Sequence, residues 1–449
     1  MSKQKIQLSD HFTYPRLLRF VLPAVGTMLF TSIYGIVDGL CVSNFVGKTA
    51  FAAVNLIMPL PQLLATIGFM LGTGGSAIVG ITLGEGDQKK ADRYFTLFLL
   101  AALVSVSVLA VLGIVFLRPI AVLLGAKGEL LDYAVRYGRI LMVSLPTFAL
   151  QNMFQSFFVT AEKPHLGFWF TVGAGCTNMV LDVLMVGVWG WGVEGAAIAT
   201  FISQLVGGVL PVFYFIDRSN SSRLHLCKTS FYSKVLRDAC INGSSELMTN
   251  LSMSLVNILY NYQLLRLAGE NGVAAYGVIM YAAFLFVAVF VGYAVGSAPI
   301  VSFHYGARNH AEVHNLYRKS LRLIAVVAVT LTLASMFIIP CVARIFVGYD
   351  AELLALTSRA FRLYALSFLI MGFNVYASSF FTALGDGVTS ALISFLRTLA
   401  FQVIAILLLP LLLGIDGIWL AVTAAELAAL AVSAAMLLTK DKVFHYRKV

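Results

Sequence analysis

Charged residues are scarce in this chain of 449 residues: only 12% are Asp, Glu, Lys or Arg, whereas 59% are hydrophobic. Soluble globular proteins carry about 25% charged residues. The shortage of charge excludes an ordinary soluble enzyme and a disordered chain. The apolar residues form long uninterrupted runs, which a β-barrel lacks because its strands alternate apolar and polar residues. We therefore expect an all-α polytopic membrane protein that is not an enzyme.

Other chemical features are also missing. The five cysteines are scattered and form no Cys-x-x-Cys pair, which argues against a disulfide framework and a zinc site. The net charge of +10 arises in short loops between apolar runs, so no nucleic-acid partner is expected. The glycine-rich stretch 72–75 lacks the Lys-Ser/Thr of a phosphate-binding loop. Without an ATP-binding motif, transport would draw on an ion gradient or on downhill flow, and no cofactor is expected besides a coupling ion.

Twelve apolar runs reach the roughly 20 residues that a membrane-spanning helix needs. They lie at 17–40, 52–80, 95–117, 133–158, 166–189, 193–216, 239–265, 273–302, 320–343, 360–383, 388–413 and 417–438. Residues 1–16 are mostly polar, so we expect the first run to direct insertion in place of a cleavable signal peptide. With the N-terminus inside, 21 of the 31 Lys and Arg residues fall on that side. The positive-inside rule then predicts a plasma-membrane protein with both termini cytoplasmic.

The two halves of the chain resemble each other. Residues 129–158 align without a gap to 352–381, with a Glu, two Arg and a Phe-Phe pair at matching positions. Six spans per half give both halves the same orientation, as in transporters built from parallel repeats. We predict a monomer with a six-helix lobe at 1–216, a cytoplasmic linker at 217–237 and a second six-helix lobe at 238–449. The two lobes would be related by a pseudo-two-fold axis along the membrane normal.

Several polar residues of the first half fall within predicted spans at similar depth. They are Asp38, Asn178, Asp182, Thr200, Tyr34 and Tyr137. Asn178 and Asp182 are four residues apart and share a helical face, as do Tyr34 and Asp38. Ionisable groups inside a membrane are costly and usually functional. Oxygen ligands of this kind suit Na⁺, and two carboxylates could instead share a proton. The alternative is that Asp38 or Asp182 is simply hydrated.

Three further charges lie within predicted spans of the second half. Glu246 falls in the inner half of its span or near the midplane. It is either a second coupling acid or a structural residue beside Asn250. Arg397 and Glu426 lie at similar mid-membrane depth. We interpret them as a structural ion pair, and the alternative is that Arg397 sets the charge of a cavity for an anionic substrate.

Short motifs follow one another in a distinctive order along the chain. They are Tyr34-Gly-Ile-Val-Asp38 followed by Val-Gly at 46–47, Gly84 with Asp87, Asn178-Met-Val-Leu-Asp182, Gly192-Val-Glu-Gly-Ala-Ala-Ile-Ala-Thr200, Ala383-Leu-Gly385 and Gly417-Ile-Trp419. No single motif is specific. Together, over essentially the whole chain, they resemble the multidrug and toxic compound extrusion (MATE) transporters of bacterial type.

This resemblance implies a V-shaped pair of bundles that exports organic cations or drugs by antiport against H⁺ or Na⁺. The residues that it assigns to the ion or proton site of the first lobe are Asp38, Asn178, Asp182 and Thr200, with Tyr34 and Tyr137 beside them. It also implies that the first span bends at Pro23 when that site is occupied. Glu246 matches a span-7 glutamate that some members use. Those members carry an aspartate in span 10 as well, and its absence here argues against coupling through the second lobe.

Two other transporter classes are alternatives. A lipid or lipid-linked oligosaccharide flippase of the same superfamily predicts a strongly cationic cavity, whereas Arg397 is the only basic residue deep within a predicted span. A sugar- or nutrient-type carrier with two six-span lobes would carry an Asp-Arg-x-Gly-Arg-type loop between spans 2 and 3. This chain has Gly84-Glu-Gly-Asp-Gln-Lys-Lys there. Antiport of organic cations is therefore the leading hypothesis.

Overall fold

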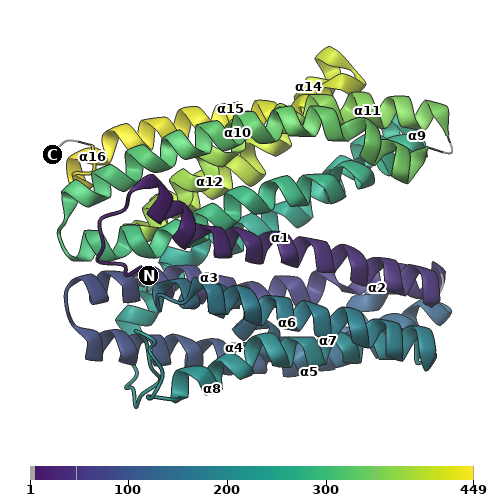
Figure 1. Ribbon diagram of the computed structural model, residues 1–449. Coiled ribbons are helices and arrows are strands. Elements are labelled where there is room, and N and C mark those ends of the chain that lie inside the picture. The colour runs from purple at the N-terminus through teal and green to yellow at the C-terminus, as the bar shows by residue number, and fades with distance from the viewer. Residues whose placement is uncertain (1–5, 47, 349, 448–449) are drawn as a thin grey trace.

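The computed structural model describes residues 6–46, 48–348 and 350–447, and the side chains at 36, 38–44, 48 and 51 also lie outside its description. All regular secondary structure in these ranges is helical (Figure 1). The elements are α1 (Tyr14–Phe45), α2 (Lys48–Ile57), α3 (Pro59–Gly84), α4 (Gln88–Leu123), α5 (Gly128–Thr160), α6 (Pro164–Asp182), the π-helical η1 (Val183–Val188), α7 (Gly192–Gly208), α8 (Leu210–Ile216), α9 (Ser233–Gly306), α10 (His310–Val347), α11 (Ala351–Ala365), α12 (Phe368–Ala383), α13 (Gly387–Phe395), the π-helical η2 (Leu396–Ala400), α14 (Phe401–Leu413), α15 (Ile415–Thr439) and α16 (Asp441–Phe444).

The predicted membrane spans can be followed along these helices. By length and composition, nine helices of the described ranges could cross a membrane, and α11 with α12, which meet at a bend of 46°, make a tenth. The 74-residue α9 counts once among the nine but contains both predicted spans 239–265 and 273–302. The remaining predicted span, 133–158, lies within the 33-residue α5. This helix is less apolar than the nine because it carries polar residues such as Gln151 and Asn152. The predicted arrangement of twelve spans in two lobes is confirmed.

Local sequence explains where the helices break. α2 gives way to α3 at Met58, directly before Pro59, whose nitrogen has no hydrogen to donate to a helix. Gly269 inside α9 has a φ of +60°, a conformation that side chains on other residues disfavour. The chain reverses there, since the rings of Tyr260 and Tyr276 stack at 4.9 Å.

Pro23, the predicted kink site in the first span, does not break its helix. α1 continues as one helix through Pro23, although proline removes one backbone donor from the helix. The Thr27 hydroxyl donates a hydrogen bond of 2.9 Å to the Pro23 carbonyl. The structure therefore contains the unbroken form of this helix.

The two halves of the chain form two sides of the molecule. Figure 1 shows the helices of the first half, purple to teal, along one side and most of those of the second half, green to yellow, along the other. Both termini lie at the same end of the bundle, as an even number of spans requires. The fifth span of each half contains a π-helical segment, η1 in the first and η2 in the second.

The lobes meet where α3 packs against α9, almost backbone to backbone. A Cβ added to Gly243 of α9 would lie 1.9 Å from the Met70 carbonyl oxygen of α3, and one added to Gly74 would lie 2.2 Å from the Ala239 carbonyl oxygen. Only glycine fits at such separations, because any larger residue would overlap the facing helix. These contacts join the lobes in the half of the bundle nearer the two termini.

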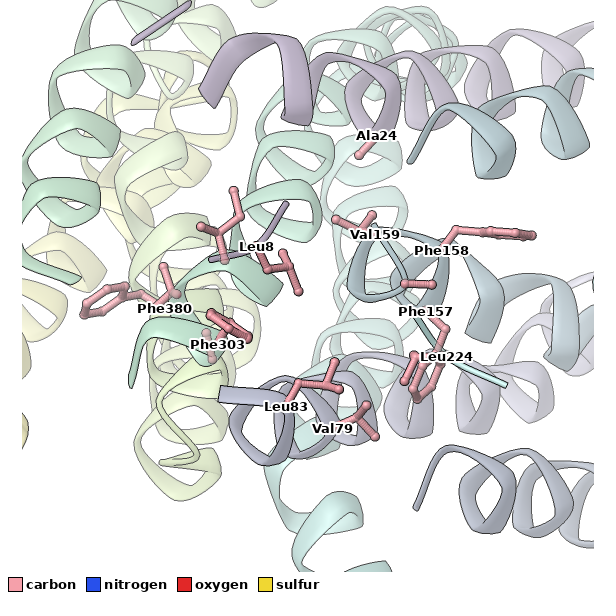
Figure 2. Packing of buried hydrophobic residues seen from close by; sticks show 14 of the residues in the cluster. Leu8, Ala24, Val79, Leu83, Phe157, Phe158, Val159, Leu224, Phe303 and Phe380 are labelled. Atoms are coloured by element: carbon pink, nitrogen blue, oxygen red, sulfur yellow. The ribbon is translucent and has the colours of Figure 1, made fainter. Parts of the chain in front are cut away.

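A hydrophobic cluster continues this contact toward the end that holds the termini. It contains Leu83 of α3, Phe303 of α9 and Phe380 of α12, together with Leu8 from the segment ahead of α1. Figure 2 shows Leu8 between residues of both lobes. Its side chain is completely buried, so the N-terminal segment forms part of the inter-lobe core.

Two glutamates hold this N-terminal segment in place. On the first lobe, Glu162 follows α5 and its Oε1 accepts the backbone N–H of Leu8 at 2.8 Å. On the second lobe, the Oε1 of Glu312 in α10 accepts the N–H of Phe12 at 2.9 Å. The segment ahead of α1 is thus attached to both lobes.

Candidate functional site

The first group of predicted site residues lies on helices that pack together. Asn178 and Asp182 lie one turn apart on α6, and their side chains are 2% and 0% exposed. α6 packs against both α1 and α7, which carry the remaining polar positions Tyr34, Asp38 and Thr200. A carboxyl group that is excluded from solvent in a membrane protein needs a polar or ionic partner nearby. The interior of the first lobe thus contains at least one acid of the kind that the sequence analysis predicted.

Tyr34 of α1 lies against the α6 face that carries these residues. A Cβ added to Gly175 would lie 3.1 Å from Cδ1 of Tyr34. Asn178 and Asp182 follow Gly175 by three and seven residues and therefore continue the same helical face. Asp38 comes one turn after Tyr34 on α1, but its side chain lies outside the described residues. The structure thus places Tyr34 of α1 beside the helix that carries Asn178 and Asp182.

The Asn178 amide has unused hydrogen-bonding capacity. Its Nδ2 is buried and has no hydrogen-bond partner among the described residues. A half-turn of the amide would present Oδ1 in place of Nδ2. In either orientation a buried amide beside a carboxyl can accommodate one more polar group, such as a cation or a protonated acid.

Thr200 and Tyr137 lie on two other helices of the first lobe, α7 and α5. Thr200 of α7 is partly buried, and its hydroxyl donates to the Ala196 carbonyl at 3.0 Å, which leaves the oxygen lone pairs available as acceptors. Tyr137 of α5 is fully buried and its hydroxyl lies 3.9 Å from the sulfur of Met58. A π-helical segment begins directly after Asp182, and such segments often occur at functional sites.

Glu246 lies in a separate place, in a cavity between the two lobes that we call the inter-lobe cavity. Its volume is about 90 Å³, room for about three water molecules at roughly 30 Å³ each. Glu246 of α9 and Arg397 of η2 are the charged residues that line it, and five Val and Ala residues supply the apolar part. The hydroxyl residues of the lining are Thr73, Ser76, Ser156, Ser245, Thr249, Ser378, Ser379, Thr382 and Ser394. The cavity lining mixes polar and apolar groups, and it draws residues from both lobes.

Behind this cavity, Arg397 and Glu426 form the ion pair that the sequence analysis favoured. The Nε of Arg397 lies 3.4 Å from Oε1 of Glu426. The other carboxylate oxygen of Glu426 accepts the Asn374 side-chain amide at 2.7 Å. The Ser433 hydroxyl in turn donates to the Asn374 oxygen at 2.8 Å. Glu426 is 1% exposed, so this network fixes the acid firmly while Arg397 reaches the cavity.

A cluster of buried hydroxyls was not anticipated from the sequence. The Oγ of Ser378 lies 2.8 Å from that of Ser390 and 2.9 Å from that of Ser394. Thr382 donates to Ser390 at 2.8 Å. Serine and threonine within apolar spans usually bond to their own helix backbone, so sequence alone gives no signal that these four would meet. Likewise, no sequence pattern marks Glu162 and Glu312 as the residues that bind the N-terminal segment.

Comparisons with known proteins support the architecture described above. The profile of the MatE family matches residues 23–184 and again 247–408. The multidrug export protein MepA of Staphylococcus saprophyticus is 21% identical over 95% of this chain and 94% of its own length. MepA of Staphylococcus aureus is also 21% identical, over 96% of this chain and 95% of its own.

Solved structures share the fold. The crystal structure of MATE in complex with MaL6 superposes with a TM-score of 0.92 at 22% identity, covering 99% of this chain and 100% of that one. The outward-facing conformation of a multidrug resistance MATE family transporter of the MOP superfamily also gives a TM-score of 0.92 at 22% identity, over 99% of both chains.

Proposed function

Because this chain belongs to the MATE family of membrane transporters, we propose that it exports organic cations or drugs by antiport against H⁺ or Na⁺. The relatives described above are multidrug export proteins. The observation that carries the proposal for this chain is the buried pair on α6, Asn178 and Asp182, whose Asn178 amide nitrogen finds no hydrogen-bond partner within the part of the chain that the structure describes. The conclusion is secondary active efflux, with the coupling ion bound in the first lobe.

The proposed coupling site is built from four helices of the first lobe. Its members are Asp38, Asn178, Asp182 and Thr200, with Tyr34 and Tyr137 beside them. If Na⁺ is the coupling ion, the carboxylate, amide and hydroxyl oxygens are its ligands. If H⁺ is the coupling ion, it binds a carboxyl group and the neighbouring amide and hydroxyl accept or donate hydrogen bonds. Both versions need the same residues.

Coupling requires that the ion and the drug favour different states of the transporter. The first helix is the element that we propose to respond, because it carries Asp38 and passes through Pro23 without a break in this structure. Occupation of the site would bend α1 at Pro23, where the helix already lacks one backbone hydrogen bond. That bend would disfavour drug binding and release the drug outward.

Glu246 is proposed as a second coupling acid that acts without the span-10 aspartate that accompanies it in some members of the family. It faces the inter-lobe cavity, whereas the first group lies inside one lobe, so the two acids would act at different places. The cavity is formed by residues of both lobes, which makes Glu246 sensitive to their separation.

We further propose that the protein acts as a monomer in the plasma membrane, with the end that holds both termini on the cytoplasmic side. Positive residues are concentrated in the loops at that end, as the positive-inside rule requires. The proposed units are the first lobe at 1–216, the linker at 217–237 and the second lobe at 238–449.

The test is export of a cationic dye from proteoliposomes that contain purified protein, driven in turn by a Na⁺ gradient and by a pH gradient. We expect one gradient to drive export and both Asp38→Asn and Asp182→Asn to abolish it. Glu194→Gln is the matched control, because Glu194 lies on α7 with a half-exposed side chain and should leave export unchanged. If neither gradient moves a cation and the substitutions are silent, antiport is wrong and the flippase alternative becomes the better hypothesis.

A further inference from the structure

The lining of the inter-lobe cavity differs from that of a site for lipophilic cations. Among its described lining residues none is aromatic, and nine carry hydroxyl groups. Aromatic faces attract organic cations through their quadrupoles, and that contribution is absent here. Hydroxyl groups instead form hydrogen bonds with polar atoms of a ligand. The cavity can therefore form hydrogen bonds with several polar atoms of a ligand, while its Val and Ala residues contact the apolar part.

The cavity also presents both signs of charge. Glu246 on α9 lines it together with Arg397 on η2. A ligand that carries only positive charge would be attracted by Glu246 and repelled by Arg397. A ligand with an ammonium and a carboxylate group can pair with both side chains.

Arg397 retains hydrogen-bonding capacity for such a carboxylate. Its one described partner is Glu426, approached through Nε at 3.4 Å, and neither Nε nor the facing Oε1 completes a hydrogen bond among the described residues. A guanidinium has five N–H donors in a planar fork that matches a carboxylate. The contact with Glu426 therefore anchors Arg397 without using most of its donors.

The anchoring residues are arranged to hold this arginine in one position. Asn374 donates to both the backbone carbonyl and the carboxylate of Glu426, at 2.9 and 2.7 Å. All of these groups are buried, whereas the Arg397 side chain is 14% exposed. A residue whose only task is to neutralise Glu426 would not need to line a cavity between the lobes.

We propose that the inter-lobe cavity recognises amphoteric molecules, with an ammonium group at Glu246 and a carboxylate at Arg397, and that Arg397 determines this specificity. The proposal rests on the export function proposed above and names its substrate class. The cavity has room for about three waters as the lobes stand here, so the ligand would enter when the lobes are further apart.

The experiment compares two rigid compounds of the same shape in the proteoliposome assay. 4-(Aminomethyl)benzoate is amphoteric, and 4-(aminomethyl)benzamide is a cation of nearly equal volume. The informative variant is Arg397→Met combined with Glu426→Gln, because removing both charges avoids an unpaired buried carboxylate. Arg397→Lys keeps the positive charge. The thermal stability of each purified variant checks that it is folded.

We expect wild-type protein to export the amphoteric compound about tenfold faster than the amide. A charge-assisted hydrogen bond to the carboxylate raises affinity by about tenfold or more. The double variant should lose this preference, measured as the ratio of the two export rates, and Arg397→Lys should keep part of it. An unchanged preference in the folded double variant, or equal loss of both compounds, would overturn the proposal. Export of the amide alone by wild type would overturn it while leaving cation efflux intact, and export of neither compound under any gradient would overturn both.

Discussion

The Nδ1 of His11 lies 2.6 Å from Oε2 of Glu312, which joins the segment ahead of the first helix to the second lobe. The other carboxylate oxygen of Glu312 accepts the Phe12 N–H and the Asn315 side-chain amide. On the first lobe, Glu162 binds the same segment through Leu8. Hydrogen bonds and a shared apolar core therefore join the two lobes at this end. The lobes can separate there only if the segment ahead of α1 loses its hydrogen bonds to one of them.

Loss of the Glu312 carboxylate should favour opening at this end. We expect Glu312→Gln to weaken the pairing with His11 by no more than about 1 kcal/mol, because the His11 side chain is 64% exposed and solvent screens the contact. Distances between spin labels on α3 and α9 near the termini should then show a larger open fraction. Glu129→Gln, at the exposed start of α5, is the control and should leave the distribution unchanged. An identical distribution in Glu312→Gln would show that the tie does not hold the lobes.

The glycine contact between α3 and α9 should tolerate no side chain. In Gly243→Ala the new methyl would lie 1.9 Å from the Met70 carbonyl oxygen, so one helix must move. We expect a loss of about 1–3 kcal/mol, the usual cost of overpacking a close contact, measured as a lower midpoint of thermal unfolding in detergent. Gly277→Ala lies in the same helix with open space around the added carbon and should be neutral or slightly stabilising. Equal midpoints for the two variants would contradict the close contact.

Asn374 should be important for stability although it lies outside the cavity lining. Asn374→Ala removes both hydrogen bonds to Glu426 and leaves a buried carboxylate less well satisfied, which costs about 1–3 kcal/mol. The thermal unfolding midpoint of the purified protein measures the loss. Asn261→Ala on the exposed part of α9 removes a hydrogen bond to the helix backbone and serves as the control. A midpoint for Asn374→Ala equal to that of the control would refute this role.

Asp386, outside the membrane spans, should contribute a pH-dependent part of the stability. Burial raises its pKa, but hydrogen bonds from Lys440 and Thr389 and the Lys440 charge outweigh burial, so the pKa lies below its usual value. The Lys440 Nζ is 2.8 Å from Oδ2. A carboxyl with a depressed pKa in the folded state contributes stability that is present above its unfolded pKa of about 3.9 and is lost as pH falls through the folded value.

The measurement for Asp386 is the unfolding midpoint as a function of pH. Asp386→Asn should lower the midpoint at pH 7, and the difference from wild type should shrink as the pH falls toward 3. Asp350→Asn is the control, because Asp350 caps α11 in the same manner through backbone N–H groups with no lysine paired to it among the described residues. A difference that stays constant across this pH range would rule out the charge as its cause.

The sequence alone determined the class of this protein, because the physical causes are local and additive. Runs of about 20 apolar residues must span a bilayer, and the ungapped alignment of residues 129–158 with 352–381 implies two similar halves. The predicted span 52–80 is in fact divided at Met58, directly before Pro59, and this break, like the separation of two spans near Gly269, has a cause in the chemistry of a single residue. The pairing of Arg397 with Glu426 was also predicted, because two opposite charges at equal depth in a membrane have few other partners.

Tertiary structure decided what the polar residues contact. Ser378, Ser390 and Ser394 meet because α12 and α13 pack against each other, and no helical period of either segment encodes that meeting. Leu8 is held between the lobes by one backbone hydrogen bond to the distant Glu162, which any residue type except proline could make. The inter-lobe cavity likewise depends on the separation of the lobes, since its lining comes from both of them. Long-range packing controls these features, and a single sequence contains no periodic signal for it.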